Sequence, residues 1–359
     1  MFVMNAWYMG AWADEVKVGE MLQRSLLDRP VVFYRLRDGA VAALEDRCCH
    51  RALPLSHGCV VDDQVQCGYH GLTFDCHGNC VRVPGQTRIP SAARVASYPA
   101  IERDQIVWIW LGDPAQADPA AVPRHAIHDD PAWSWVKDRY LVKANYQLIT
   151  DNLMDLTHVG YVHTRTIGGT PEAHSDAETK TTRLDNGVRV TRWMMDSVPP
   201  PSYLAAHTFG TPKVDRWMEI EFIPPSVVRI HTGAVDTGTG AREGNRSGGI
   251  AFMGLNLQTP ETATTTHYFW SGARTCGPDR HEETRASLMR SLPITFGEDK
   301  VVVEAQQMSM DANPDGPLVM IASDAGLVHA RRIVADMLAR EAAPPTQSSA
   351  PPQNLPAQA

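Results

Sequence analysis

The chain has 359 residues, of which 43% are hydrophobic and 21% charged, which is enough for two domains with cores of ordinary composition. Its formal net charge is −8 and no run of Lys and Arg occurs, which argues against a nucleic-acid-binding protein. The apolar stretch 1–13 has no charged leader and is followed by Asp14 and Glu15, so we expect neither a signal peptide nor a membrane span.

Short strands separated by turn residues predict a small all-β domain over residues 1–115. The strands expected there cover residues 31–36, 40–44, 73–74, 80–83 and 106–111. The stretch 115–122, which is rich in Ala, Pro and Asp, marks the expected boundary to a second domain.

Two Cys–His pairs dominate the first domain, Cys48 with His50 and Cys67 with His70, and sixteen residues separate the pairs. Two thiolates and two imidazoles can hold a [2Fe–2S] cluster with both Cys on one iron and both His on the other, which raises its reduction potential. Zinc is the alternative, but zinc sites usually begin with two closely spaced Cys and end with two His. The odd number of cysteines, seven, fits a reducing cytoplasm better than a disulfide framework.

Residues 116–342 mix strands and helices, which together with the first domain predicts an α+β protein. We expect strands at 140–145, 188–192, 217–222, 227–231, 250–257 and 264–270, with a turn at Thr259-Pro260-Glu261 and a mobile Gly-rich loop at 233–249. The expected helices are 146–158, 281–292, 298–310 and 325–340, and the tail 343–359 is predicted to be disordered.

A second concentration of metal-ligand residues begins at Asp151. On one helix, Asp151, Asp155 and His158 would share a face, and the chain would have to bend, with Gly160 offering the break, to bring His163 alongside. Two imidazoles and one carboxylate on one side of a ferrous ion form the facial triad of non-haem iron oxygenases. The best distant carboxylate is Asp299, and Glu298 is the runner-up.

With both patterns, the chain resembles the oxygenase component of Rieske non-haem iron oxygenases, and most of all the vanillate O-demethylase and toluenesulfonate methyl-monooxygenase branch. The resemblance rests on the segments Asn5-Ala6-Trp7-Tyr8, Cys67-Gly68-Tyr69-His70-Gly71-Leu72, Pro84-Gly85-Gln86, residues 151–158 and Asp324-Ala325-Gly326. Cys49 departs from the Pro of many members and points toward the sulfonate branch.

The resemblance implies a Rieske domain followed by a catalytic domain with a helix-grip sheet. It implies that Cys48, His50, Cys67 and His70 bind the cluster and that His158, His163 and Asp299 bind a mononuclear Fe(II), with Asn152 near the iron. Asp155 matches the carboxylate that carries electrons from the cluster of one subunit to the iron of the next, which implies a homotrimer.

The function expected is a cytoplasmic monooxygenase that oxidises a methyl or methoxy group of a small aromatic acid with O₂. Electrons would come from NAD(P)H through a flavin-containing partner reductase. Ring hydroxylation or N-demethylation is the alternative, and an electron carrier without its own active site is a more distant one. Arg165, Arg192, His231 and His267 are conceivable anchors for a carboxylate or sulfonate, although a surface or sheet-pairing role explains each more readily.

Overall fold

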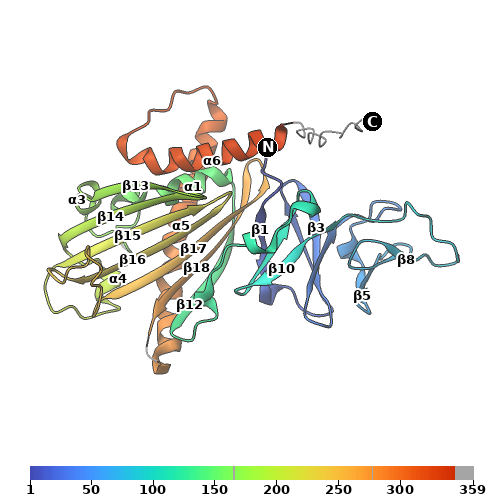
Figure 1. The fold of residues 1–359 in the computed structure, drawn as a ribbon, viewed down its shortest axis with the longest axis horizontal. Coiled ribbons are helices and arrows are strands. Elements are labelled where there is room, and N and C mark those ends of the chain that lie inside the picture. The colour runs from blue at the N-terminus through green and yellow to red at the C-terminus, as the bar shows by residue number, and fades with distance from the viewer. Residues whose placement is uncertain (165, 277, 344–359) are drawn as a thin grey trace, which may run out of the picture.

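The computed structural model describes residues 1–164, 166–276 and 278–343, and its first part consists of three small antiparallel sheets (Figure 1). One has the order β1-β11-β10, from β1 (Trp7–Trp12), β10 (Ala100–Arg103) and β11 (Ile106–Trp110). The second has the order β2-β3-β4-β9, from β2 (Met21–Leu26), β3 (Arg29–Arg35), β4 (Val41–Glu45) and β9 (Ser97–Tyr98). The third has the order β5-β6-β7-β8, from β5 (Cys59–Val61), β6 (Gln64–Gln66), β7 (Thr73–Phe74) and β8 (Cys80–Arg82). The predicted all-β character of this part is confirmed.

The second part is built on one antiparallel seven-stranded sheet of order β12-β18-β17-β16-β15-β14-β13. Its strands are β12 (Trp133–Val142), β13 (Glu178–Leu184), β14 (Gly187–Ser197), β15 (Val214–Ile223), β16 (Val227–Asp236), β17 (Ile250–Thr262) and β18 (Thr265–Thr275). The helices are α1 (Tyr146–Met154), α2 (Val159–Val162), α3 (Pro171–Ser175), α4 (Pro201–Leu204), α5 (His281–Ala312) and α6 (Ala325–Ala342). Because α1 contacts both the central strands and α5, these two helices cover the same face of the sheet (Figure 1).

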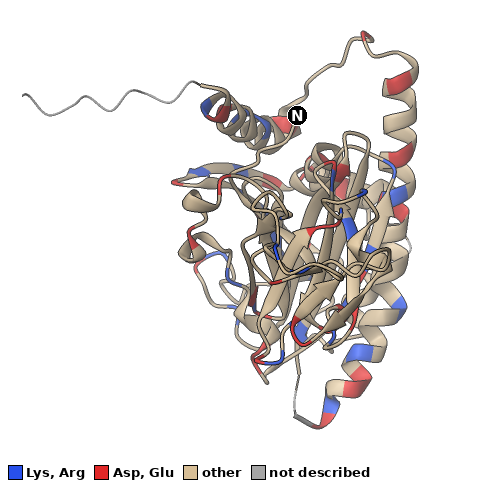
Figure 2. Ribbon diagram, turned by 90° about the vertical axis from the view of Figure 1, so that its right-hand side faces the viewer, with Lys and Arg blue, Asp and Glu red and all other residues tan. Residues whose placement is uncertain are grey.

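The helix α5 corrects the prediction of two separate helices, because it runs unbroken for 32 residues through Pro293 and Gly297 (Figure 2). Local propensity favours a break at a proline, since it lacks an N–H donor. Packing outweighs this preference: Leu288, Thr295 and Val303 on α5 are buried, and the Tyr140 hydroxyl on β12 donates to the Pro293 carbonyl at 3.1 Å. The sheet therefore fixes a helix that the local sequence would interrupt.

Two further expectations about β17 and its neighbours are wrong. The predicted turn at Thr259-Pro260-Glu261 is part of β17, and the carbonyls of Pro260 and Glu261 accept hydrogen bonds from the backbone amides of Leu27 and Asp28. Tertiary pairing with the first part thus extends the strand past the proline. The Gly-rich loop is also shorter than expected, because β16 continues to Asp236. The predicted disordered tail, beyond Ala343, lies outside the described residues.

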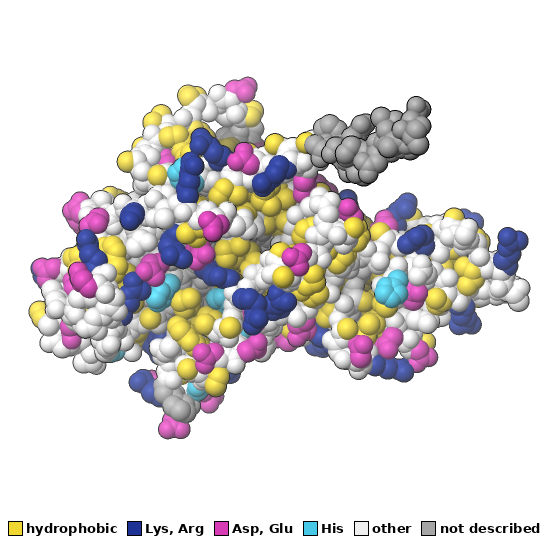
Figure 3. Space-filling model, viewed as in Figure 1, with side chains coloured by type: hydrophobic (Ala, Val, Ile, Leu, Met, Phe, Trp, Pro, Cys, Tyr) yellow, Lys and Arg dark blue, Asp and Glu magenta, His cyan; other side chains and the backbone are white. Residues whose placement is uncertain are grey.

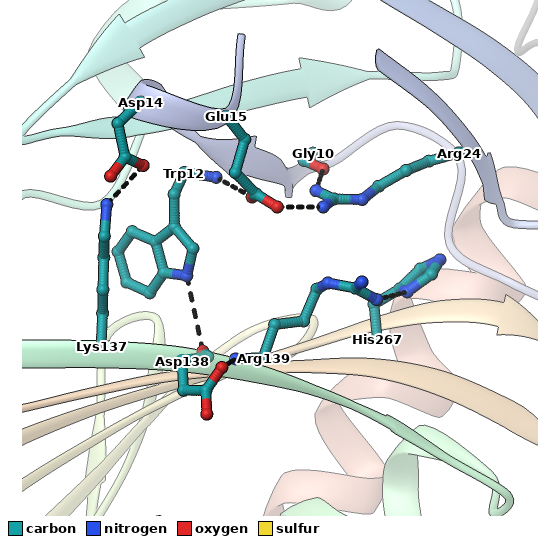
Figure 4. Close-up of polar contacts among 9 residues, drawn as sticks. All are labelled: Gly10, Trp12, Asp14, Glu15, Arg24, Lys137, Asp138, Arg139 and His267. Carbon is teal, nitrogen blue, oxygen red and sulfur yellow. Dashed lines mark hydrogen bonds and ion pairs between the residues drawn. The ribbon is translucent and has the colours of Figure 1, made fainter. Parts of the chain in front are cut away.

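The two parts are joined by polar contacts that are exposed or partly buried (Figure 4). Lys137 on β12 pairs with Asp14 at 2.5 Å and lies 5.0 Å from the ring centroid of Trp12. Arg139 contacts the His267 ring at 3.1 Å, and the other nitrogen of that ring lies 3.0 Å from the Ser25 carbonyl. These contacts fix the first part against the edge strand β12 and its neighbour β18.

Charged side chains of both signs are interspersed over the molecule. Figure 2 shows acidic and basic residues mixed over the ribbon, and Figure 3 shows no broad basic patch on the face that it presents. Among the residues that the structure describes, no helix is both long and apolar enough to cross a membrane.

Candidate metal centres

The two Cys–His pairs of the first part lie in two loops with the same backbone hydrogen bonds. The Cys48 amide donates to the Leu53 carbonyl and the Cys67 amide to the Leu72 carbonyl, each at 2.8 Å. In each loop the residue four after the Cys donates back to the Cys carbonyl and has positive φ, 60° at Ala52 and 71° at Gly71. The sequence thus folds one turn twice.

The four side chains of these loops converge. Cys48 and Cys67 are buried, whereas His50 and His70 are exposed with their ring centroids 4.6 Å apart. Burial raises the pKa of the Cys48 thiol to about 11, against a hydrogen bond from the His50 backbone that lowers it. Buried sulfurs on one side and solvent-facing imidazoles on the other fit the donor set of a two-iron cluster with Cys and His on different irons.

The approach of the loops depends on glycine. A Cβ built on Gly58 would lie 1.9 Å from the Gln66 carbonyl oxygen, and one on Gly68 would lie 2.4 Å from that of His57. Real Cβ atoms cannot come so near to backbone oxygen, so glycine at both positions lets the two loops close on one another.

The second group of ligand-type residues follows a break in the helix. This break lies at Asp155 and not at Gly160, where it was predicted. The helix α1 ends at Met154, and Asp155 is extended, with φ −118° and ψ 93°, before a 3₁₀ turn (Leu156–His158) and α2. Asp151, Asp155 and His158 therefore do not share one helix face. Gly160 lies within α2, where its role is packing, since a Cβ there would lie 2.6 Å from Cα of Pro171.

This break brings His158 and His163 together over α5. The Nε2 atoms of His158 and His163 lie 3.4 Å and 3.1 Å from Oδ1 of Asp299, and one ligand atom from each residue lies within 4.8 Å of the others. Imidazole nitrogen and carboxylate oxygen bind divalent transition-metal ions at about 2.0–2.2 Å, so adjacent ligand atoms of one ion should be about 3 Å apart. The three side chains fit one metal ion.

The other ring nitrogens are held by acceptors. Nδ1 of His158 lies 2.7 Å from the Asp155 carbonyl oxygen, and Nδ1 of His163 lies 2.8 Å from Oε2 of Glu298. Since both Nδ1 atoms must donate in these bonds, both Nε2 atoms keep a lone pair for a metal, as is usual for metal-binding histidines. Glu298, the runner-up as a ligand, thus contacts the far side of His163 and does not face Asp299.

The electrostatics of the group fit a cation. Burial alone raises the pKa of the Asp299 carboxyl, but hydrogen bonds and charge from His158 and His163 outweigh it and hold the pKa below its usual value. Burial likewise lowers the pKa of His163, and the Asp299 and Glu298 carboxylates outweigh it, so the net shift is upward. The buried carboxylates therefore favour positive charge between these residues.

The other predicted residues surround this group. Nδ2 of Asn152 donates to Oδ1 of Asp299 at 3.2 Å. The Asp155 carboxylate accepts from the Thr157 amide at 2.9 Å and from the Ser323 hydroxyl at 3.0 Å. Asp151 points elsewhere and pairs with Arg331 on α6.

A cavity of about 130 Å³ lies between the sheet and α5, lined mainly by apolar side chains such as Met218, Ile230, Phe252, Leu292 and Phe296. Phe296 is one helical turn before Asp299 on α5, and Ile167 lies four residues after His163, so the cavity adjoins the metal-ligand group without being lined by it. Arg192, His231 and His267 are absent from its lining, and Arg165 lies outside the described residues.

The polar residues of the lining include Arg216 and Ser202, neither of which was among the predicted site residues. The sequence did contain a signal for Arg216. In β15 this residue lies on the same face as the buried residues Val214, Met218, Ile220 and Phe222, since all of them occupy every second position. Period-two alternation therefore assigns Arg216 to the apolar face. Ser202 gave no signal, because its position depends on the short helix α4.

Comparisons with known proteins agree with both parts. Residues 6–99 match the Rieske [2Fe-2S] domain, and residues 142–340 match the vanillate O-demethylase oxygenase C-terminal domain. The chain is 39% identical over 343 residues to the iron–sulfur subunit of the toluene-4-sulfonate monooxygenase system of Comamonas testosteroni, covering 95% of this chain and 98% of that protein. It is 36% identical over 346 residues to a vanillate O-demethylase oxygenase subunit of Pseudomonas sp. (strain HR199), covering 95% and 96%.

Among solved structures, dicamba monooxygenase bound to dicamba superimposes with a TM-score of 0.84 at 35% identity, covering 95% of this chain and 99% of that chain. A solved structure of the same enzyme with non-haem iron has a TM-score of 0.78 at 34% identity. The chain therefore belongs to the Rieske oxygenases with a vanillate O-demethylase-type catalytic domain, and it is the oxygenase component of a monooxygenase that depends on a partner reductase. This assignment overturns both the electron-carrier and the zinc-protein alternatives.

Proposed function

We propose that this oxygenase oxidises a methyl or methoxy group of a small aromatic acid. The observation that carries the proposal is the pairing of the His158, His163 and Asp299 group with an adjoining cavity of about 130 Å³. An apolar cavity of about 150 Å³ accommodates benzene, so this one suits a single ring. The relatives named for toluene-4-sulfonate, vanillate and dicamba support a single-ring substrate.

The ligand roles are part of the proposal. Cys48, His50, Cys67 and His70 would hold the [2Fe–2S] cluster, and His158, His163 and Asp299 would hold Fe(II). Iron bound there would supply O₂ chemistry, in which one oxygen atom enters the C–H bond and the other leaves as water, with two electrons and two protons consumed. A methoxy substrate would then release formaldehyde, and a carbon-bound methyl would become an alcohol.

The residues around the iron site have positioning roles in this proposal. Glu298 and the Asp155 carbonyl orient the two imidazoles, and Asn152 orients the carboxylate of Asp299. The Asp155 carboxylate would also link the iron site to the cluster of a neighbouring subunit.

The homotrimer is supported by a hydrophobic segment beside Asp155. Residues Leu318, Val319, Met320 and Ile321 are all more than half exposed, and exposed apolar stretches of this kind mark interfaces. Ser323, two residues further, donates to the Asp155 carboxylate. A neighbouring subunit that covered this segment with its cluster-bearing part would have its cluster close to Asp155. The thiolate ligands fit a cytoplasmic protein served by an NAD(P)H-dependent flavin reductase.

The test is a panel of methyl- and methoxy-benzoates and sulfonates with a reductase, in which O₂ uptake, formaldehyde and hydroxymethyl products are measured. We expect O₂ uptake coupled to product for at least one aromatic acid. The Asp299→Asn variant, which removes the charge of one proposed ligand, should retain the visible spectrum of the cluster and lose most of its product formation. Product formation at the parent rate by that variant would refute the iron assignment.

N-dealkylation is the second candidate, because the chain is also 34% identical over 351 residues to the oxygenase component of chloroacetanilide N-alkylformylase. Oxidation of an N-alkyl anilide with no reaction of any aromatic acid would favour it. A ring-hydroxylated product would favour the third, a ring hydroxylase.

A further inference from the structure

Arg216 is a buried cation at the wall of the cavity. Its side chain projects from β15 on the same face as Met218, and the residue is 1% exposed. Its guanidinium carbon lies 5.2 Å from the ring centroid of Tyr203, on α4. Tyr203 is held in turn by a 2.6 Å hydrogen bond between its hydroxyl and that of Thr232.

The guanidinium has spare donors. Among the residues that the structure describes, Arg216 forms no ion pair, and its Nε and Nη1 atoms are buried without a hydrogen-bond acceptor. The Ser202 hydroxyl, which lines the same cavity, is also buried without a partner. Native structures leave few buried donors unsatisfied, so donors from two elements at one cavity indicate a polar ligand.

The charge expected for that ligand follows from the positive charge of Arg216. An Arg guanidinium remains protonated in proteins, and an unpaired buried cation is strongly unfavourable until an anion joins it. Arg192 on the adjacent strand β14 reinforces the positive potential, since it is 2% exposed and its register partner is Met218, two residues from Arg216. Burial lowers the pKa of Arg192 and the Asp155 carboxylate raises it, whereas among the residues that the structure describes no carboxylate does so for Arg216.

The site lies beside the metal-ligand group. A Cβ built on Gly169 would be 3.6 Å from Nη1 of Arg216, and the Gly168 amide donates to the His163 carbonyl at 3.0 Å. Arg216 therefore lies against the segment that follows His163, on the side of the cavity nearest to the metal-ligand group.

We propose that Arg216, assisted by Ser202, binds the anionic group of an aryl carboxylate or sulfonate and so directs the ring's methyl or methoxy group toward His158, His163 and Asp299. The inference rests on the proposed function, since it specifies the substrate of that site. Arg216 acts as a positioning residue, and a guanidinium matches both oxyanions because its N–H groups can donate to two oxygens together.

The experiment compares charged ligands with neutral ligands of similar shape. The pairs are toluene-4-sulfonate with toluene-4-sulfonamide, and 4-methoxybenzoate with 4-methoxybenzamide. Dissociation constants are measured by calorimetry on the full oxygenase, and kcat and KM are measured with the reductase. The variants are Arg216→Met, which keeps volume without charge, Arg216→Lys, which keeps charge without the planar fork, and Ser202→Ala. Arg189→Met, on the exposed side of β14, is the matched control.

The parent should bind at least one anion about 10- to 100-fold more tightly than its neutral partner, the range expected for hydrogen bonds to a charged group. Arg216→Met should bring the two within about threefold, raise KM for the anion, and leave Tm unchanged or higher, because an unpaired buried charge is replaced by an apolar side chain. Arg216→Lys should retain part of the parent's preference for the anion, and the control Arg189→Met should retain all of it. Whichever of the two anions shows the larger preference identifies the oxyanion.

An anion preference that survives Arg216→Met, or its absence from the parent protein, would overturn the inference. Efficient oxidation of the neutral ligands with no effect of Arg216→Met would do so while leaving the proposed function intact. The reverse result, Arg216-dependent anion binding without any oxidation, would support the anchor and refute the proposed reaction.

Discussion

At the scale of single residues, the geometry of the proposed iron site depends on neighbours that do not face the three proposed ligands. Glu298 and Asp299 are adjacent on α5, yet Asp299 faces both Nε2 atoms whereas Glu298 accepts from Nδ1 of His163. A carboxylate behind a histidine fixes its tautomer and raises its basicity. Two consecutive acidic residues thus have two different roles.

We therefore expect Glu298→Ala to weaken binding of the mononuclear iron about 10- to 100-fold, because His163 loses the acceptor that orients it. Glu298→Gln should have a smaller effect, since its amide oxygen can still accept from Nδ1. Iron affinity is measured by chelator competition, with the visible absorption of the cluster as an internal reference. Glu282→Ala, on the same helix and exposed, is the control. Equal affinity in the Ala and parent proteins would contradict this role.

At the scale of elements, α5 contributes Asp299, Glu298 and one wall of the cavity in a single helix. Its course is set by the sheet beneath it. On β18, Gly272 admits Leu292 of α5, since a Cβ at Gly272 would lie 2.2 Å from Cδ1 of that leucine. Gly297 has no such duty, because a Cβ there would have no heavy atom within 4 Å.

Gly297→Ala should accordingly stabilise the protein by about 0.5–1 kcal/mol, because alanine restricts the unfolded chain and meets no neighbour in the helix. Thermal unfolding of the two proteins side by side provides the measurement. Gly272→Ala is the opposite control and should lower Tm, since Leu292 must move. A lower Tm for Gly297→Ala would mean that α5 needs a flexible point before Glu298.

The same elements show what the sequence can and cannot predict. The grouping of the Cys and His side chains of the first part could be anticipated because residue type and spacing are local properties, and the alternation of β15 held a usable signal for Arg216. The continuity of α5 and the end of α1 at Met154 were not predictable, because both depend on packing between distant segments. The pairing of Glu298 with His163 joins residues 135 positions apart, which no local pattern records.

At the scale of the whole molecule, neutral histidines lie where the two parts meet. The ring nitrogens of His128 contact the Asp104 carbonyl and the Ser271 hydroxyl, each at 2.8 Å, so this ring bridges a turn of the first part and β18. Burial lowers its pKa to about 4, and burial likewise lowers the pKa of His267, which reaches Ser25, to about 4.

These shifts predict loss of stability in mild acid. Below about pH 6.5 the unfolded chain binds a proton at His128 that the folded chain excludes until about pH 4. The free energy of unfolding therefore decreases as the pH is lowered from about 6.5 to about 4, by up to roughly 3 kcal/mol for this ring. The measurement is urea unfolding at pH 7 and pH 5. Between pH 7 and pH 5, His128→Gln, which can keep both hydrogen bonds, should lose less stability than the parent. His77→Gln, at an exposed position, should lose as much stability as the parent. An equal loss in all three proteins would contradict the argument.

The helix α5 carries both the Asp299 carboxylate and the apolar side chains Leu292 and Phe296. Any rotation of this helix would therefore change the shape of the cavity and the geometry of the proposed iron site together. The opposite wall, on β15 and α4, bears none of the proposed iron ligands. Natural divergence toward new substrates should accordingly accumulate on that wall, where a changed side chain retunes selectivity without disturbing oxygen chemistry.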